Sequence, residues 1–124
     1  MSERILIVDD SSLARRRART ILEGGGYEVI EAEDGMSAIE RYFVEKPDVV
    51  MLDLVMKGMY GLDVLAQLRQ IDPNARVIVV SADVQTSSHQ MAEDGGAAGF
   101  LVKPLDETEA LTLVRKALGP NHAT

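Results

Sequence analysis

Five residues with chemically active side chains follow predicted apolar strands, each at the point where its strand ends. Asp9 and Asp10 follow the first apolar run of the chain, Asp53 the third, Ser81 the fourth and Lys103 the fifth. Because the carboxyl ends of parallel strands lie along one edge of a sheet, these side chains are expected to converge. The sequence therefore predicts a small region that holds three carboxylates, one hydroxyl and one ammonium.

Such a set of groups favours phosphoryl chemistry. Two or three carboxylates close together cannot all stay ionised without a cation. Since no histidine or cysteine accompanies them, the expected cation is the oxygen-ligated Mg²⁺. Lys103 adds a positive charge aimed at an anion, and Ser81 offers that anion a hydrogen bond. A metal ion, an ammonium and a hydroxyl around Asp53 would hold a phosphoryl group bonded to that carboxylate, as an acyl phosphate.

Strand-like and helix-like segments alternate along the chain. The expected strands cover 4–8, 27–32, 49–53, 76–80 and 100–102. The expected helices run from Ser11 or Ser12 to Gly24, from Asp34 to the residues before Pro47, from Leu62 to Asp72, from Val84 to Glu93 and from Glu107 to Leu118. The segment 54–61 is expected to be irregular. Because a helix lies between successive strands, the prediction is an α/β fold, a doubly wound five-stranded parallel sheet with five helices.

Composition limits the classes of protein to which the chain can belong. Its 124 residues suit one domain with a real core. The formal net charge of −7 argues against binding nucleic acid through the protein's own field. The absence of cysteine excludes disulfides and fits a cytoplasmic protein. We expect neither a signal peptide nor a membrane anchor, because no apolar run is long enough to span a bilayer.

Four short motifs at the strand ends resemble the receiver domains of two-component response regulators: Ile7-Val8-Asp9-Asp10, Met51-Leu52-Asp53, Val80-Ser81-Ala82 and Leu101-Val102-Lys103-Pro104. The resemblance covers essentially the whole chain. It implies a flavodoxin-like strand order 2-1-3-4-5, with a receiver domain at residues 1–119 and a frayed tail at 120–124. One turn departs from the family pattern, because Lys57 and Tyr60 stand where proline and aspartate are common.

The resemblance also implies roles for the residues of the acidic region. Asp53 matches the phosphoacceptor, which is also a ligand of Mg²⁺. Asp10 matches the carboxylate that binds the ion directly, and Asp9 the one that acts mostly through water. The backbone carbonyl of Val55 would be the third protein ligand. Lys103 matches the lysine that pairs with the phosphoryl group.

A second group of residues matches the switch of the family. Ser81 corresponds to the switch hydroxyl and Phe100 to the switch aromatic, and the bond from Lys103 to Pro104 is expected to be cis. The helix 84–93 has few apolar anchors, so it is expected to shift at low cost. Since Phe100 lacks a hydroxyl, we expect it to lie partly inward before any signal arrives.

The resulting functional prediction is a phosphorylation-dependent signalling switch of the stand-alone, chemotaxis type. It is expected not to be an enzyme, and to act as a cytoplasmic monomer or weak dimer. Its partners would be a sensor histidine kinase or histidine phosphotransfer domain and a downstream protein target, reached through the face formed by the helix 84–93, the strand 100–102 and the helix 107–118. The alternatives are a phosphate sink, an interaction module that is never phosphorylated, and a flavodoxin-like electron carrier.

Three expectations concern surface and packing. Arg15, Arg16 and Arg19 should form a solvated helix face, with a docking surface for an acidic partner as the alternative. His89 should be exposed. The methionines are expected to fill gaps in the core and loops rather than to form a groove: Met36, Met51, Met56, Met59 and Met91.

Overall fold

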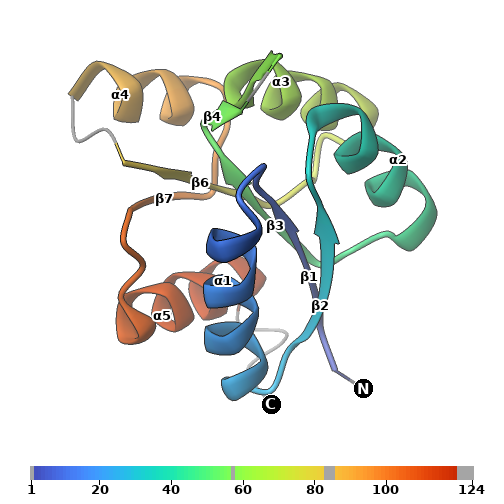
Figure 1. The fold of residues 1–124 in the computed structure, drawn as a ribbon. Helices are drawn as coiled ribbons and strands as arrows, with labels where there is room; N and C mark the ends of the chain where they lie inside the picture. The colour runs from blue at the N-terminus through green and yellow to red at the C-terminus, as the bar shows by residue number, and fades with distance from the viewer. Residues whose placement is uncertain (1, 57, 83–85, 120–124) are drawn as a thin grey trace.

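A parallel sheet forms the centre of the molecule (Figure 1). The structure is a computed structural model that describes residues 2–56, 58–82 and 86–119. Within these ranges five strands form the sheet, in the order β2 (Glu28–Ala32), β1 (Arg4–Val8), β3 (Val49–Asp53), β6 (Val77–Ser81) and β7 (Gly99–Val102). This order confirms the predicted flavodoxin-like arrangement, and it places β3 at the centre.

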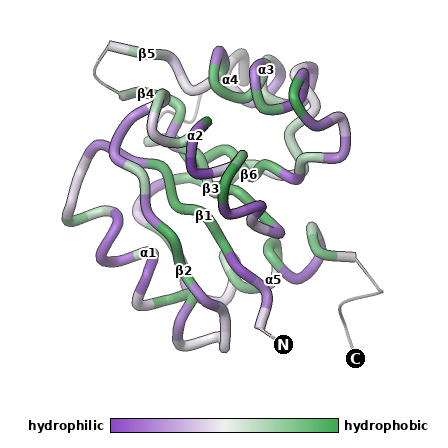
Figure 2. Tube along the Cα trace, turned by 90° about the vertical axis from the view of Figure 1, so that its right-hand side faces the viewer, coloured by the Kyte–Doolittle hydropathy of each residue, from purple (hydrophilic) through white to green (hydrophobic). Residues whose placement is uncertain are grey.

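Helices cover both faces of the sheet (Figure 1). One face carries α1 (Ser12–Gly24) and α5 (Glu107–Leu118), and the other carries α2 (Gly35–Glu45), α3 (Gly61–Ile71) and α4 (Thr86–Asp94). Successive residues of a strand point to opposite faces, so Leu6 and Val8 join the core beneath α2 and α3, whereas Ile5 and Ile7 join the core beneath α1 and α5. Figure 2 shows the continuous hydrophobic course of β1 and β3 between these layers.

Polar side chains begin three of the helices, two of them at positions that the sequence predicted. The Ser11 hydroxyl accepts a hydrogen bond from the backbone N–H of Ala14, so Ser11 and not Ser12 is the cap of α1. Asp34 caps α2 in the same way, and Asp106 caps α5. Each cap satisfies a backbone donor at a helix start that otherwise lacks a partner, which fixes where the strand end passes into the helix.

The loop after β3 is more ordered than predicted. The segment 54–61 was expected to be irregular, but β4 (Val55–Met56) and β5 (Met59–Tyr60) pair antiparallel within it. Lys57, which departs from the family pattern, lies outside the described residues. Gly58 has a positive φ of 78°, a conformation that glycine adopts without strain. This pairing gives the chain a defined path from Asp53 into α3.

The packing expectation for the methionines is wrong at two positions. Met36 and Met91 do not fill gaps, since 79% and 50% of their surfaces are exposed, whereas Met51 and Met56 are buried.

The fourth helix begins at Thr86. Val84, from which it was expected to start, lies outside the described residues, as does the tail 120–124. None of the helices in the described part of the chain combines the length and the apolar character needed to cross a membrane.

Candidate functional site

The predicted site residues meet at the carboxyl edge of the sheet. The Lys103 ammonium, just after β7, lies 2.8 Å from Oδ2 of Asp9 at the end of β1. It lies 3.5 Å from Oδ2 of Asp53, the last residue of β3. Both carboxylates are buried. Strand ends along one edge of the parallel sheet therefore bring together residues that are up to 94 positions apart in the chain.

Three carboxylates of the described chain could share one cation. Oxygen atoms of Asp9, Asp10 and Asp53 all lie within 4.8 Å of one another. Asp10 is exposed, so the group opens to solvent on the side where a hydrated ion would arrive. Carboxylate oxygens without nitrogen or sulfur donors fit a hard cation that keeps part of its water, as Mg²⁺ does.

Burial and charge act together on the Asp53 carboxylate. Burial raises the pKa of Asp53, and the nearby charge of Asp9 raises it further. The Lys103 ammonium and a hydrogen bond from the backbone of Val55 oppose this rise without cancelling it. Asp53 therefore holds its negative charge at a cost, which a bound cation would reduce.

Lys103 is held in its charged form. Burial lowers its pKa, but the hydrogen bond to Asp9 and the charges of Asp53 and Asp9 outweigh that effect, so the pKa lies above its usual value. The backbone N–H of Lys103 also donates to the carbonyl of Ser81 at 2.8 Å. The bond from Lys103 to Pro104 is cis, as predicted.

The remaining predicted residues surround this centre at different depths. Ser81 is buried at the end of β6, directly beside Val102 of β7. Val55 is exposed and lies two residues after Asp53, the last residue of β3, and its backbone hydrogen-bonds to the Asp53 carboxylate. Phe100 is half-buried and packs against the core beneath α2, α3 and α4. Phe100 also stacks on the exposed His89, with ring centroids 4.7 Å apart, a contact that sequence patterns do not predict.

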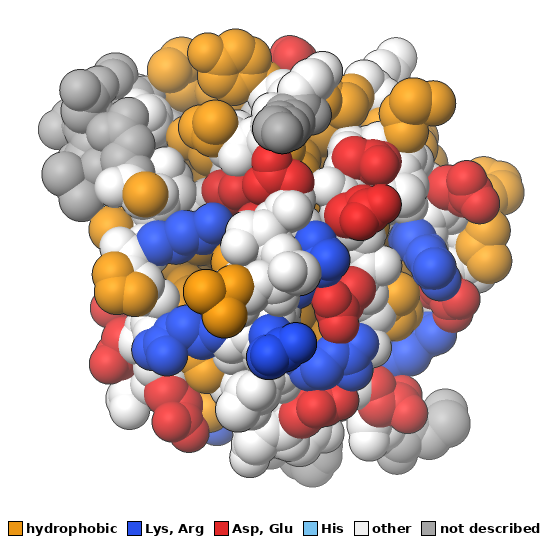
Figure 3. All heavy atoms as spheres, in the orientation of Figure 1, with side chains coloured by type: hydrophobic (Ala, Val, Ile, Leu, Met, Phe, Trp, Pro, Cys, Tyr) orange, Lys and Arg blue, Asp and Glu red, His pale blue; other side chains and the backbone are white. Residues whose placement is uncertain are grey.

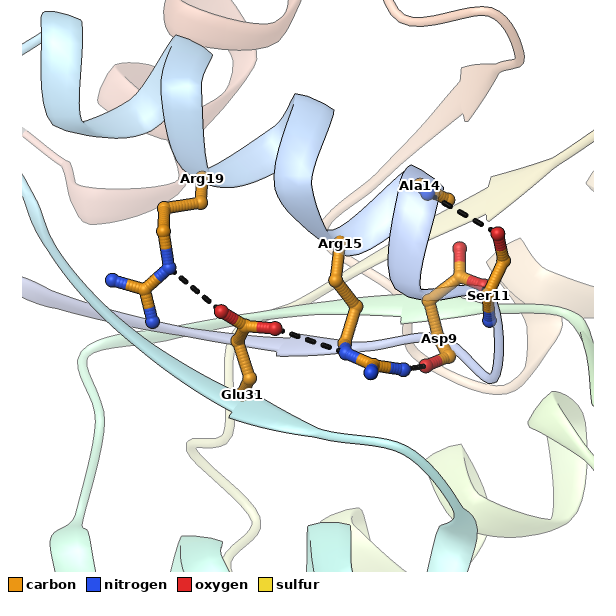
Figure 4. A network of polar contacts seen from close by, with 6 residues as sticks. All are labelled: Asp9, Ser11, Ala14, Arg15, Arg19 and Glu31. Carbon is orange, nitrogen blue, oxygen red and sulfur yellow. Dashed lines mark hydrogen bonds and ion pairs between the residues drawn. The ribbon is translucent and has the colours of Figure 1, made fainter.

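The arginines of α1 are more constrained than predicted. Arg15 and Arg19 do not simply point into solvent, because both form ion pairs with Glu31 of β2, at 2.9 and 2.6 Å (Figure 4). Arg15 also donates to the backbone carbonyl of Asp9 at 2.6 Å. The spacing of Arg15 and Arg19 by one helical turn was visible in the sequence, but their common partner was not.

Charged side chains of both signs cover the face that contains the site. Figure 3 shows acidic side chains in the upper middle of this face, Lys and Arg side chains across its middle, and further acidic side chains along its lower edge. A groove of about 940 Å³ runs from Asp53 and Lys103 along α1, with walls that include Leu13 and Leu105. Asp53 thus lies at the end of a groove open to the surface.

Comparison with known proteins agrees with this geometry. Residues 5–115 match the family described as the response regulator receiver domain. The chain belongs to this family. It is 41% identical over 119 residues to the chemotaxis protein CheY of Bacillus subtilis, covering 95% of this chain and 99% of that protein. It is 39% identical to CheY of Thermotoga maritima over 117 residues, covering 94% and 98%.

A solved structure extends the likeness of this receiver domain. The crystal structure of the CheX–CheY–BeF3–Mg²⁺ complex from Borrelia burgdorferi matches with a TM-score of 0.88 and 34% identity, over 92% of this chain and 87% of that chain. Membership of the receiver family assigns the chain to phosphorylation-based signalling in two-component systems, as a phosphoacceptor rather than an enzyme. The fold alone does not distinguish a receiver from a flavodoxin-like electron carrier. The family match does, and it decides against the electron carrier.

Proposed function

We propose that Asp53 accepts a phosphoryl group from a histidine on a sensor kinase or a histidine phosphotransfer domain, and that the phosphorylated chain then signals to a partner protein. The observation that carries this proposal is the position of the Lys103 ammonium, 3.5 Å from Asp53 and within a group of three carboxylates. An isolated buried aspartate would lack both the counter-charge and the cation ligands that a phosphoryl group requires.

The transfer is a displacement at phosphorus. An Asp53 carboxylate oxygen attacks the phosphorus atom, an O–P bond forms, and the P–N bond to the donor histidine breaks with its electrons returning to the imidazole. Asp53 is buried at the end of a central strand, so its position is set by the sheet. The protein contributes positioning and charge neutralisation rather than covalent chemistry of its own.

The acidic residues fit a Mg²⁺ site. Asp10, Asp53 and the Val55 carbonyl would bind the ion directly, and Asp9 would act mostly through water. When bound, Mg²⁺ would neutralise charge on Asp53 and on the incoming phosphoryl oxygens. The spacing of the three carboxylates supports this assignment, as does the ion in the related Borrelia complex.

Lys103 and Ser81 would hold the product. The ammonium, now hydrogen-bonded to Asp9, is near enough to Asp53 to exchange that partner for a phosphoryl oxygen. The Ser81 hydroxyl would donate to another phosphoryl oxygen. Because Ser81 ends β6 just before the connection to α4, its movement would act on the start of that helix.

The output surface would be the face formed by α4, β7 and α5, with Phe100 as the residue that changes packing. Among the described hydrophobic side chains of α4, Ala92 is buried whereas Met91 is exposed, so little area holds this helix. The receiver unit would be residues 1–119, acting in the cytoplasm as a monomer or weak dimer.

The test is phosphorylation by phosphoramidate, a small donor with a P–N bond. In the presence of Mg²⁺, intact mass should show one added phosphoryl group on the wild-type protein and none on Asp53→Asn. Equal modification of both proteins would contradict the proposal.

A further inference from the structure

A pair of oppositely charged side chains holds the backbone that carries the acidic residues. The Arg15 Nε donates to Oε1 of Glu31 at 2.9 Å, and its Nη1 donates to the Asp9 carbonyl at 2.6 Å. Figure 4 shows Arg15 reaching from α1 to both partners, with Arg19 on the other side of Glu31. The guanidinium is a rigid fork, so engaging two partners fixes its position as well as theirs.

The hydrogen bond to Asp9 acts on the peptide group between the two acidic residues. The Asp9 carbonyl belongs to the bond that joins Asp9 to Asp10, so its direction sets the orientation of the plane from which Asp10 extends. The Asp9 side chain is oriented separately, by the Ser11 N–H at 2.9 Å and by Lys103 at 2.8 Å. Arg15 therefore restrains a part of the loop that these side-chain contacts do not reach.

Glu31 keeps the guanidinium in this position. Hydrogen bonds from Arg19 and Arg15 lower the pKa of Glu31, so it stays ionised and holds Arg15 on the β2 side of the loop. Only 15% of the Arg15 side chain is exposed, against 36% for Arg19, so the Arg15 pair is the better shielded from solvent. Without Glu31, the Arg15 guanidinium would be free to turn toward the carboxylates that would bind Mg²⁺.

We infer that Arg15 is a positioning residue for the cation site, which orients the Asp9–Asp10 peptide and is itself held by Glu31. The inference rests on the proposed function, because it concerns the ion that Asp10 and Asp53 would bind. Arg15 would touch neither the ion nor the phosphoryl group, and would act through the backbone of Asp9, to whose carbonyl it donates.

The direction in which the Mg²⁺ affinity changes when Arg15 is removed distinguishes a positioning role from a purely electrostatic one. Removing a positive charge near a cation site strengthens cation binding if only Coulomb forces act. Removing a positioning contact weakens it, because the ligands no longer start in the binding arrangement. Arg19 is a matched control, since it pairs with the same Glu31 one helical turn away and none of its described contacts reaches Asp9.

The experiment is calorimetric titration of Mg²⁺ into the wild type, Arg15→Ala, Arg15→Lys and Arg19→Ala, with urea unfolding of each protein in cation-free buffer. Arg15→Ala should raise the Mg²⁺ dissociation constant roughly tenfold. Arg19→Ala should leave it unchanged although both alanine variants lose some stability. Arg15→Lys keeps the charge and one donor group, so it should recover part of the affinity.

Two results would overturn the inference while leaving the proposed function intact. One is Mg²⁺ binding by Arg15→Ala that is as tight as in the wild type or tighter. The other is an equal loss of affinity in Arg19→Ala, which would make the effect a general consequence of weakening α1. A wild-type protein that binds no Mg²⁺ would instead overturn the proposed function, and this inference with it.

Discussion

The Lys103 ammonium donates to Oδ2 of Asp9 at 2.8 Å. The same nitrogen lies 3.5 Å from Asp53, the proposed acceptor. The lysine is therefore closer to Asp9 than to the carboxylate that would carry the phosphoryl group. A phosphoryl group on Asp53 would add anionic oxygens and change this balance. The exchange of partners by Lys103 is thus a local event that could begin the switch.

Replacing Lys103 by alanine should separate phosphorylation from switching. Asp53 should still be modified by phosphoramidate in the presence of Mg²⁺, because the cation would neutralise much of the charge. The conformational response should weaken, because no ammonium then holds the phosphoryl oxygens. Amide chemical shifts of β7 and α4, recorded with and without the donor, measure this. A response of wild-type size in Lys103→Ala would remove the lysine from the switch.

The two adjacent acidic residues should contribute unequally to Mg²⁺ affinity. Asp10→Ala should weaken binding by about tenfold or more, because a direct ligand is lost. Asp9→Ala should weaken it less, since Asp9 acts mostly through water. Calorimetric titration of both variants compares them directly. Equal losses, or a larger loss for Asp9→Ala, would show that the direct ligand is assigned to the wrong residue.

Asp53→Asn should stabilise the cation-free fold at neutral pH. Burial and the charge of Asp9 raise the pKa of Asp53 in the folded protein. The folded state therefore binds this proton more tightly than the unfolded chain, and ionised Asp53 costs stability at pH values above the raised pKa. The asparagine variant lacks this cost, and its gain should be on the order of 1 kcal/mol.

The pH dependence of this gain provides the check. As the pH falls through the raised pKa toward the ordinary value of an aspartate, Asp53 takes up its proton and the difference between the two proteins should shrink. Urea unfolding of both proteins without divalent cations, from neutral to acid pH, measures it. A gain that stays constant across this range would contradict the assigned cause.

Phosphorylation should alter amide exchange most in α4. Among the described parts of this helix, Ala92 is fully buried whereas Met91 is half exposed, so opening the helix costs little buried area. The stack of Phe100 on His89 links the helix to β7, so both should change together. Exchange measured by mass spectrometry should show larger changes in 86–102 than in 35–45. The reverse order would place the output on α2.

The strand ends were predictable because each depends on local sequence. The apolar run before Asp53 predicts a buried central strand, and Ser11 and Asp34 are polar residues at the starts of helical patterns. Parallel pairing then brings the strand ends together, so the meeting of Asp9, Asp53 and Lys103 followed from the fold class alone.

The contacts that orient these residues were not predictable from local sequence. The hydrogen bond from Arg15 to the Asp9 carbonyl depends on how α1 lies over the end of β1, and its partner Glu31 comes from another strand. The stack between His89 and Phe100 depends in the same way on tertiary packing. Exposure of Met36 reverses an expectation drawn from residue type, since an apolar side chain on a helix is buried only if that face meets the core.

The most direct test of the central claim is to locate the phosphoryl group chemically. Borohydride reduces an aspartyl phosphate to homoserine, which marks the modified position permanently. After treatment with phosphoramidate and Mg²⁺, peptide sequencing by mass spectrometry should find homoserine in place of Asp53 and aspartate unchanged at Asp9 and Asp10. Homoserine at Asp9 or Asp10, with Asp53 unmodified, would contradict the assignment of Asp53 as the acceptor.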